Sequence, residues 1–126
     1  MILIIGGVYQ GKLAYALDRF NLTENDIYKC SEDDITAPAD RKIIYEIEKW
    51  ILSLVKTESD VDSAVRKLIN DTNDAVVICN DISCGIVPLN PTERKWREAV
   101  GRSMAELSKV SSEVIRLFCG IPTRIK

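Results

Sequence analysis

The sequence predicts an α/β fold in which a parallel sheet carries helices on its faces. Apolar runs of strand length alternate along the chain with stretches whose apolar residues recur at helical spacing, and this alternation is typical of βαβ units. The first run, Ile2–Ile5, is apolar throughout, as expected of a strand buried on both faces. The chain has 126 residues, and we expect residues 1–126 to form one domain.

The first half of the chain predicts two units of strand and helix. Apolar residues repeat at helical spacing after the first strand: Leu13, Ala16, Leu17 and Phe20. A short strand is expected within 26–30, before an acidic stretch and a loop that reaches residue 40. Residues 42–56 leave two interpretations open, a helix throughout or a strand over 42–45 that leads into a helix from about Glu46. In both, we expect helix for at least 47–56.

The second half continues the alternation. A capping sequence at Ser59–Asp62 opens a helix with a regular apolar stripe, formed by Val61, Ala64, Val65, Leu68 and Ile69. Ala75–Cys79 is a short apolar run, as expected of an inner parallel strand. Asn90 as N-cap and Pro91 at the first helical position open another helix, with a core stripe at Trp96, Val100, Met104 and Leu107. Val114–Cys119 is expected to close the sheet as its last strand.

The turn after the first strand has the sequence of a phosphate-binding loop. Residues 6–12 read G-G-V-Y-Q-G-K and fit the pattern G-x-x-x-x-G-K. In such loops, successive backbone N–H groups surround a polyphosphate and the lysine contacts its β and γ oxygens. A tight turn that needs glycine only for its backbone conformation is the alternative. The expected nucleotide-binding residues are Gly6, Gly7, Val8, Tyr9, Gln10, Gly11, Lys12 and Leu13, and Lys12 is also expected to be catalytic.

The loop lacks one metal ligand, because Leu13 replaces the serine or threonine whose hydroxyl helps to hold Mg²⁺. We therefore expect a weakened Mg²⁺ site. Ligands of parallel sheets bind beyond the carboxyl ends of the strands, where Asp81 follows an apolar run. Asp81 is predicted to be catalytic and to hold the metal, with an Asx turn as the alternative. Glu46 is a second metal candidate, with less weight because a helix over 42–56 would make it a solvated surface charge.

Composition limits the possible functions. The chain contains no histidine, which excludes imidazole metal sites, histidine triads and phosphohistidine or nucleotidyl-histidine intermediates. Its net charge of −2 gives no reason to expect a nucleic-acid partner. The four cysteines lack zinc-site spacing and are expected to be reduced, with Cys79 and Cys119 as small apolar residues and Cys84 exposed. Without a basic leader or a membrane span, we expect a cytoplasmic protein.

Several segments resemble the adenosylcobinamide kinase/adenosylcobinamide-phosphate guanylyltransferase family. Residues 80–88, N-D-I-S-C-G-I-V-P, are similar to the family's N-E-V-G-x-G-I-V-P. Residues 97–102 resemble its helix that ends in G-R-x-N-Q, and residues 114–126 resemble its last strand and its G-I-P-x-K-x-K tail. Residues 1–12 resemble its opening, M-I-L-V-T-G-G-x-R-S-G-K-S.

This resemblance implies a P-loop, RecA-like architecture that binds ATP or GTP with Mg²⁺ and acts on a cobinamide-type corrinoid in cobalamin biosynthesis or salvage. It also implies a homo-oligomer. Arg102 matches the family's arginine, which could turn toward a phosphate or pair with Glu98. The chain departs from the family pattern at Tyr9, Gln10, Leu13, Ser83 and at the residues after Arg102.

The resemblance also bears on guanylyl transfer. The family's guanylylated histidine belongs to a central segment that is shortened here, and no histidine replaces it. Three interpretations stay open: a cobinamide-kinase-like phosphotransferase without histidine-dependent guanylyltransferase activity, an inert nucleotide- or phosphate-binding sensor or subunit, and a structural descendant with no ligand.

Overall fold

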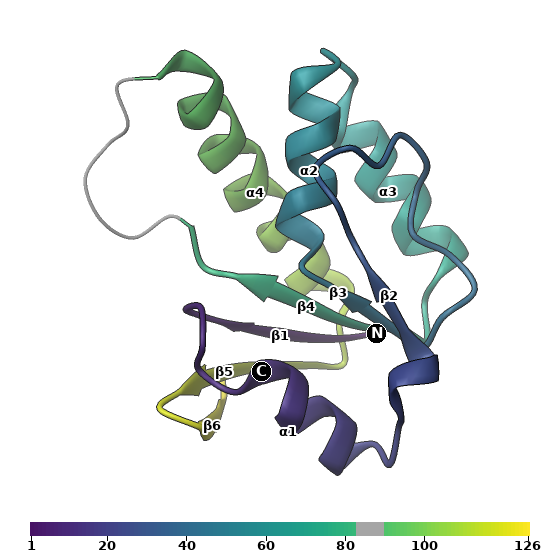
Figure 1. Ribbon diagram of the computed structural model, residues 1–126, viewed down its shortest axis with the longest axis vertical. Coiled ribbons are helices and arrows are strands. Elements are labelled where there is room, and N and C mark those ends of the chain that lie inside the picture. Colours follow the sequence, from purple (N-terminus) through teal and green to yellow (C-terminus); the bar gives the residue numbers. More distant parts are fainter. Residues whose placement is uncertain (83–89) are drawn as a thin grey trace.

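The computed structural model describes residues 1–82 and 90–126. In chain order its elements are β1 (Ile2–Gly6), α1 (Lys12–Arg19), a 3-10 turn (Glu24–Asp26), β2 (Ile27–Lys29), β3 (Ile43–Tyr45), α2 (Ile47–Lys56), α3 (Val61–Asp71), β4 (Val76–Asn80), α4 (Pro91–Val110), β5 (Glu113–Phe118) and β6 (Ile121–Arg124). The strands form one sheet of order β2-β3-β4-β1-β5-β6. Helix α1 covers one face, and α2, α3 and α4 cover the other (Figure 1).

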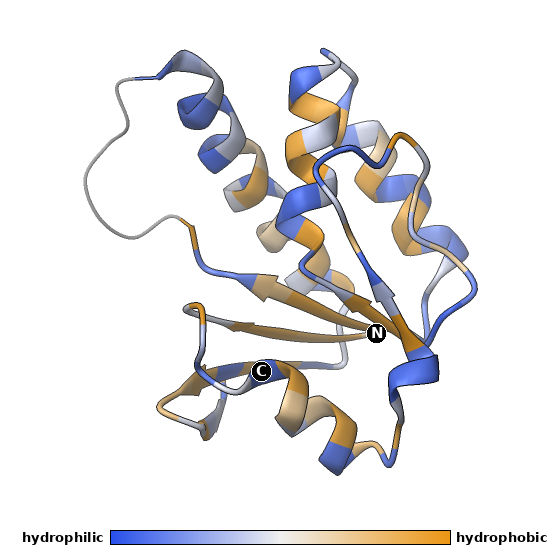
Figure 2. Ribbon diagram, viewed as in Figure 1, coloured by the Kyte–Doolittle hydropathy of each residue, from blue (hydrophilic) through white to orange (hydrophobic). Residues whose placement is uncertain are grey.

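This layered α/β arrangement confirms the predicted fold class, because neighbouring strands are parallel from β2 to β5. Alternate side chains of each strand point to opposite faces. In β1, Ile4 packs on the α1 side and Leu3 packs on the side of the other helices. The apolar central strands therefore lie between two layers of core (Figure 2).

Residues 42–56 follow the second of the two predicted interpretations. Strand β3 comes first, and α2 starts at Ile47 after a break at Glu46. Ile43 and Ile44 are both fully buried although they point to opposite faces of the sheet. Two adjacent buried isoleucines fit an inner strand, and β3 is hydrogen-bonded between β2 and β4.

Strand β5 does not close the sheet as predicted, since the antiparallel strand β6 follows it. The edge position of β6 accommodates Pro122, which lacks an N–H for a further ladder. The prediction for Cys119 is also wrong, because it lies in the β5–β6 turn with a φ of 52° and is exposed. Cys30 and Cys79 are buried free thiols, whereas Cys84 lies outside the described residues.

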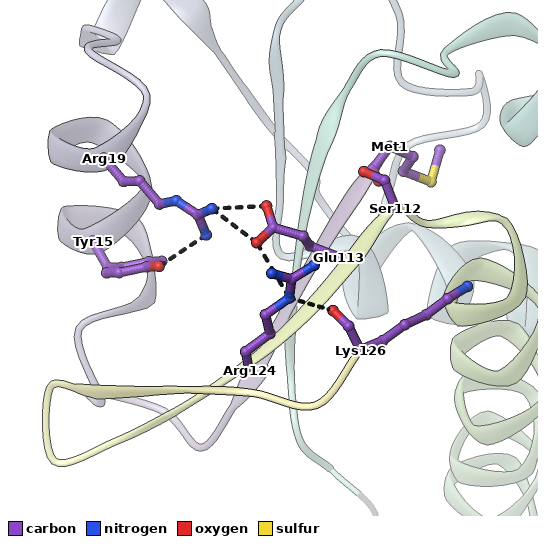
Figure 3. A network of polar contacts seen from close by, with 7 residues as sticks. All are labelled: Met1, Tyr15, Arg19, Ser112, Glu113, Arg124 and Lys126. Atoms are coloured by element: carbon purple, nitrogen blue, oxygen red, sulfur yellow. Dashed lines mark hydrogen bonds and ion pairs between the residues drawn. The ribbon is translucent and has the colours of Figure 1, made fainter.

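A polar network joins α1 to the end of the chain (Figure 3). The Arg19 guanidinium donates to both carboxylate oxygens of Glu113, at 2.9 and 2.7 Å, and to the Tyr15 hydroxyl at 3.0 Å. Arg124 approaches the same carboxylate at 3.6 Å. The helix that follows the phosphate loop is thereby tied to β5 and β6. None of the helices in the described parts of the chain is long and apolar enough to span a membrane.

Candidate nucleotide-binding site

The predicted phosphate loop joins β1 to α1 at the carboxyl edge of the sheet. Gly6 is required by packing, since a Cβ there would lie 2.5 Å from the Leu117 carbonyl oxygen. Gly11 caps α1 with left-handed backbone, φ 86°, and Tyr9 is also left-handed, φ 61°. The loop thus curls back before the helix begins, and the N–H groups of a helix N-terminus favour an anion there.

The β5–β6 turn supports this loop through Gln10. The backbone carbonyl of Gln10 accepts a hydrogen bond from the N–H of Gly120 at 3.1 Å. Its side-chain Oε1 accepts from the N–H of Cys119 at 2.5 Å. The phosphate loop therefore rests on the last hairpin of the chain, although the two are more than a hundred residues apart.

Lys12 lies inside the curl of the loop. Its side chain is only 4% exposed, and Nζ donates to the Gly7 carbonyl at 2.5 Å. Burial lowers the pKa of Lys12, and the charges of Glu48 and Glu46 offset part of this effect. A bound phosphate would compete with the Gly7 carbonyl for the ammonium group and would favour its charged form.

A cavity of about 410 Å³ opens beside Lys12. Its walls come from the phosphate loop, the start of α1, the β3–α2 junction and the end of β4: Val8, Tyr9, Gly11, Lys12, Leu13, Ala14, Tyr45, Glu46, Lys49 and Asn80. Leu13 is among the lining residues and also packs against the core on the α1 side of the sheet, at a position where a P-loop protein usually offers a hydroxyl. Carboxylate, amide and ammonium groups supply its polar lining.

Glu46 is brought into this cavity by the break between β3 and α2. It has left-handed backbone, φ 60° and ψ 49°, a conformation that is uncommon outside glycine and clusters at functional sites. Its side chain is 12% exposed and pairs with the Lys49 ammonium at 2.5 Å. Burial and then the nearby charge of Glu46 raise the pKa of Tyr45. The metal candidate given less weight in the sequence therefore lies near Lys12.

Asp81 follows β4 directly, at the carboxyl edge of the sheet. It is exposed and lines a smaller cavity of about 170 Å³ together with residues of β1 and α4, among them Ile5, Val100 and Gly101. Its backbone N–H donates to the Gly6 carbonyl at 2.8 Å. Asn80 lines this smaller cavity as well as the cavity of Lys12, whose lining does not include Asp81.

Arg102 is not among the residues that line the cavity of Lys12. Its Nε lies 3.5 Å from Oδ1 of Asp62, so that it links α4 to α3 at the protein surface. The sequence did not predict this partner. The other expected nucleotide-binding residues, from Gly6 to Leu13, are consecutive and run from the end of β1 to the start of α1.

Sequence reasoning missed Glu48 as a functional candidate. Glu48 is 2% exposed, and its two carboxylate oxygens accept hydrogen bonds from Nδ2 and N of Asn80, at 2.6 and 3.1 Å. Burial raises the pKa of Glu48, and the hydrogen bonds from Asn80 oppose that rise. The sequence did contain a signal for Glu48. It lies between the buried residues Ile47 and Ile51 of α2, where an apolar side chain is normally found.

Comparison with protein families places most of the chain in a known family. Residues 33–125, nearly three-quarters of the chain, match the family described as cobinamide kinase / cobinamide phosphate guanyltransferase. The chain belongs to this family. A search of curated proteins found no match. The cobinamide kinase family has a P-loop fold and comprises nucleotide-binding transferases of cobalamin biosynthesis. The match starts at residue 33, after the phosphate loop, so it does not bear on the loop itself.

The cavity beside Lys12 offers suitable donors for the metal that this family uses with its nucleotide. Mg²⁺ prefers oxygen ligands and is usually held by one or two protein groups, water and substrate phosphates. Glu46 supplies a carboxylate and Asn80 an amide oxygen. Within residues 1–82 and 90–126, no three acidic or cysteine side chains gather into a metal site. The residues present fit a metal that arrives with the nucleotide.

Proposed function

We propose that this member of the cobinamide kinase family binds ATP or GTP with its phosphates over Gly6–Leu13. The γ-phosphoryl group then passes to a hydroxyl of a cobinamide-type corrinoid. The observation that carries the proposal is the buried Lys12 in a curled loop, beside a cavity that also holds Glu46. Loop, lysine and carboxylate are the groups that phosphoryl transfer requires for positioning and charge compensation.

Each group has a role in this proposal. The loop N–H groups and Lys12 hold the phosphate oxygens, and Glu46 and Asn80 hold the Mg²⁺ of the nucleotide. The metal neutralises charge that develops on the transferred group. As the acceptor oxygen bonds to phosphorus, the bond to the β-phosphate oxygen breaks, and the acceptor proton passes to water or to a carboxylate. Asp81 stays a second candidate for the catalytic acid, and Arg102 a candidate for phosphate contact.

Histidine-dependent guanylyl transfer is not part of the proposal, because the chain has no histidine to carry the nucleotidyl group. A second function is favoured by a specific observation. Leu13 offers no hydroxyl to a metal, and Lys12 donates within its own loop. These features suit an inert nucleotide- or phosphate-binding sensor or subunit, which would bind the same ligand without transferring phosphate.

The first experiment tests binding. ATP and GTP are titrated by calorimetry against the wild type and Lys12→Ala. One charge-assisted contact contributes about 1.5–3 kcal/mol, so we expect Lys12→Ala to weaken affinity by roughly ten- to a hundredfold. Equal affinity of both proteins would remove the phosphate loop from the proposal.

The second experiment separates a kinase from an inert binder. Adenosylcobinamide is incubated with protein, Mg²⁺ and ATP or GTP, and phosphorylated corrinoid is measured by chromatography and mass spectrometry. We expect product with the wild type and none with Lys12→Ala. Glu46→Gln and Asp81→Asn then compare the two acids, since the catalytic one should lower turnover far more than nucleotide affinity. Intact binding without product would favour the inert protein, and a guanylylated protein would contradict the proposal.

A further inference from the structure

Both oxygens of the buried Glu48 carboxylate accept hydrogen bonds from Asn80. Oε1 accepts from the side-chain Nδ2 of Asn80 at 2.6 Å, and Oε2 accepts from the backbone N–H of Asn80 at 3.1 Å. The indole N–H of Trp96 fixes the Glu48 backbone through its carbonyl at 2.7 Å. A carboxylate with 2% exposure is costly unless it is paired and hydrogen-bonded. Asn80 supplies hydrogen bonds, and Lys12 supplies opposite charge nearby.

This contact fixes the orientation of the Asn80 amide. Because its nitrogen is held by Glu48, its oxygen is the atom left to accept from other groups. Asn80 stands at the end of β4, opposite Gly6 in the adjacent strand β1, and lines the cavity of Lys12. In P-loop proteins an aspartate holds Mg²⁺ from such a strand. Here a neutral amide occupies the cavity wall, and the negative charge lies behind it on Glu48.

We propose that Glu48 is a positioning residue that directs the Asn80 amide oxygen toward the metal of the bound nucleotide. The two residues together replace a single strand-end aspartate. The inference rests on the proposed function in one respect, that a nucleotide with Mg²⁺ occupies the cavity beside Lys12. It adds to that function the residue that orients the metal-facing group.

The first test exchanges the two side-chain types. Glu48→Gln alone turns an amide N–H₂ toward the donors of Asn80, so that donors face donors. Asn80→Asp alone places two carboxylates face to face. In the double variant the introduced amide donates to the introduced carboxylate, while its oxygen accepts from the backbone N–H at position 80. The pair is restored with its polarity reversed, and the charge of the cluster is unchanged.

Urea unfolding of the wild type, the two single variants and the double variant measures the coupling between positions 48 and 80 in the absence of ligand. We expect each single variant to raise the unfolding equilibrium constant by about tenfold or more. The double variant should return to within about threefold of the wild type, because coupled residues give non-additive effects. Glu106→Gln, on the exposed face of α4, is the control. Its unfolding equilibrium constant should stay within about twofold of the wild type. Additive effects of the two substitutions would overturn the inference.

The second test measures nucleotide affinity with Mg²⁺ and with EDTA. We expect Mg²⁺ to tighten ATP binding to the wild type by a factor of about five, the range of one neutral hydrogen bond. Folded Glu48→Gln should lose this gain, and the double variant should regain it. A wild-type gain retained in Glu48→Gln would overturn the positioning role. Absence of nucleotide binding by the wild type would overturn the proposed function and this inference together, whatever the unfolding cycle gives.

Discussion

At the scale of single residues, we expect Leu13 to weaken the dependence of the site on metal. It stands where a hydroxyl would coordinate Mg²⁺ and lines the cavity of Lys12. We expect Mg²⁺ to change the nucleotide affinity of the wild type by less than about tenfold. Leu13→Ser should enlarge this effect, because it adds an oxygen ligand at the first turn of α1.

Calorimetric titrations with Mg²⁺ and with EDTA measure this dependence in both proteins. Leu13→Ala is the matched control, since it removes the same apolar side chain without adding a hydroxyl. A strong requirement for Mg²⁺ in the wild type would contradict the prediction and would show that other oxygen ligands are sufficient.

The choice between Asn80 and Asp81 shows what the sequence could predict of the site. The end of the apolar run at Cys79 located the edge of the sheet correctly. Which of the next two residues faces Lys12 depends on the phase of the strand relative to α1, which comes from pairing with β1 and β3. In a sequence, a carboxylate suggests a metal ligand more readily than an amide does. Asn80 lines the cavity of Lys12 and is hydrogen-bonded to Glu48, whereas Asp81 stays the candidate that the sequence predicts.

At the scale of elements, the close approach of β1 and β5 leads to a prediction about two glycines. Gly6→Ala would place a Cβ 2.5 Å from the Leu117 carbonyl oxygen, and we expect it to lower the free energy of unfolding by about 1–3 kcal/mol. Gly101 lies inside α4, and an added Cβ there meets nothing within 4 Å. Gly101→Ala should therefore stabilise the protein by about 0.5–1 kcal/mol.

Urea unfolding of both variants checks these signs, and each serves as the control for the other. Destabilisation by Gly101→Ala, or a neutral effect of Gly6→Ala, would contradict the packing described for β1 and α4.

The contact between α1 and β5 predicts a dependence on pH. The hydrogen bond from Arg19 lowers the pKa of Glu113 in the folded protein. A carboxylate with a lowered pKa stabilises the folded state fully above its unfolded pKa of about 4.3, and this contribution is lost as the pH falls through the folded pKa. Glu113→Gln should therefore destabilise the protein at pH 7 and have a smaller effect near pH 3.

Urea unfolding of the wild type and Glu113→Gln at both pH values measures this difference. An equal gap in the free energy of unfolding at pH 7 and pH 3 would mean that the charge of Glu113 makes no contribution. The free energy of unfolding of Arg19→Gln should likewise fall less between pH 7 and pH 3 than that of the wild type, because the substitution removes the pair of Arg19 and Glu113.

Most elements followed from the sequence, and the exceptions have physical causes. Strand β3 overlaps a helical stripe, because buried isoleucines at positions 43, 47 and 51 satisfy both periods. Only the pairing of β3 with β2 and β4 resolves this ambiguity. Strand β6 is exposed at every residue and contains Pro122, so no apolar alternation marks it. Such an edge strand depends on its partner β5, a tertiary effect that local patterns do not contain.

At the scale of the whole molecule, the loop after β1 and the turn between β5 and β6 meet at the candidate site. Gln10 in the phosphate loop is bonded to Cys119 and Gly120 in the last hairpin. Gln10→Ala removes the side-chain bond and keeps the backbone bond. We expect it to weaken nucleotide affinity by roughly two- to tenfold, the value of one hydrogen bond, with little change in the circular dichroism spectrum.

Calorimetry measures the affinity, and truncation after Phe118 gives the stronger form of the same change, because it removes the whole turn and β6. Unchanged affinity in both proteins would show that the loop keeps its shape without the hairpin.

The sheet order also determines when the protein can fold during its synthesis. Strand β1 is translated before its partners β4 and β5, which end at residues 80 and 118. At about 5–20 residues per second, the apolar segment Ile2–Ile5 waits unpaired for at least several seconds. The phosphate loop acquires its support only when residues 119 and 120 leave the ribosome. Nascent chains stalled before that point should therefore bind nucleotide more weakly than chains that include the last hairpin.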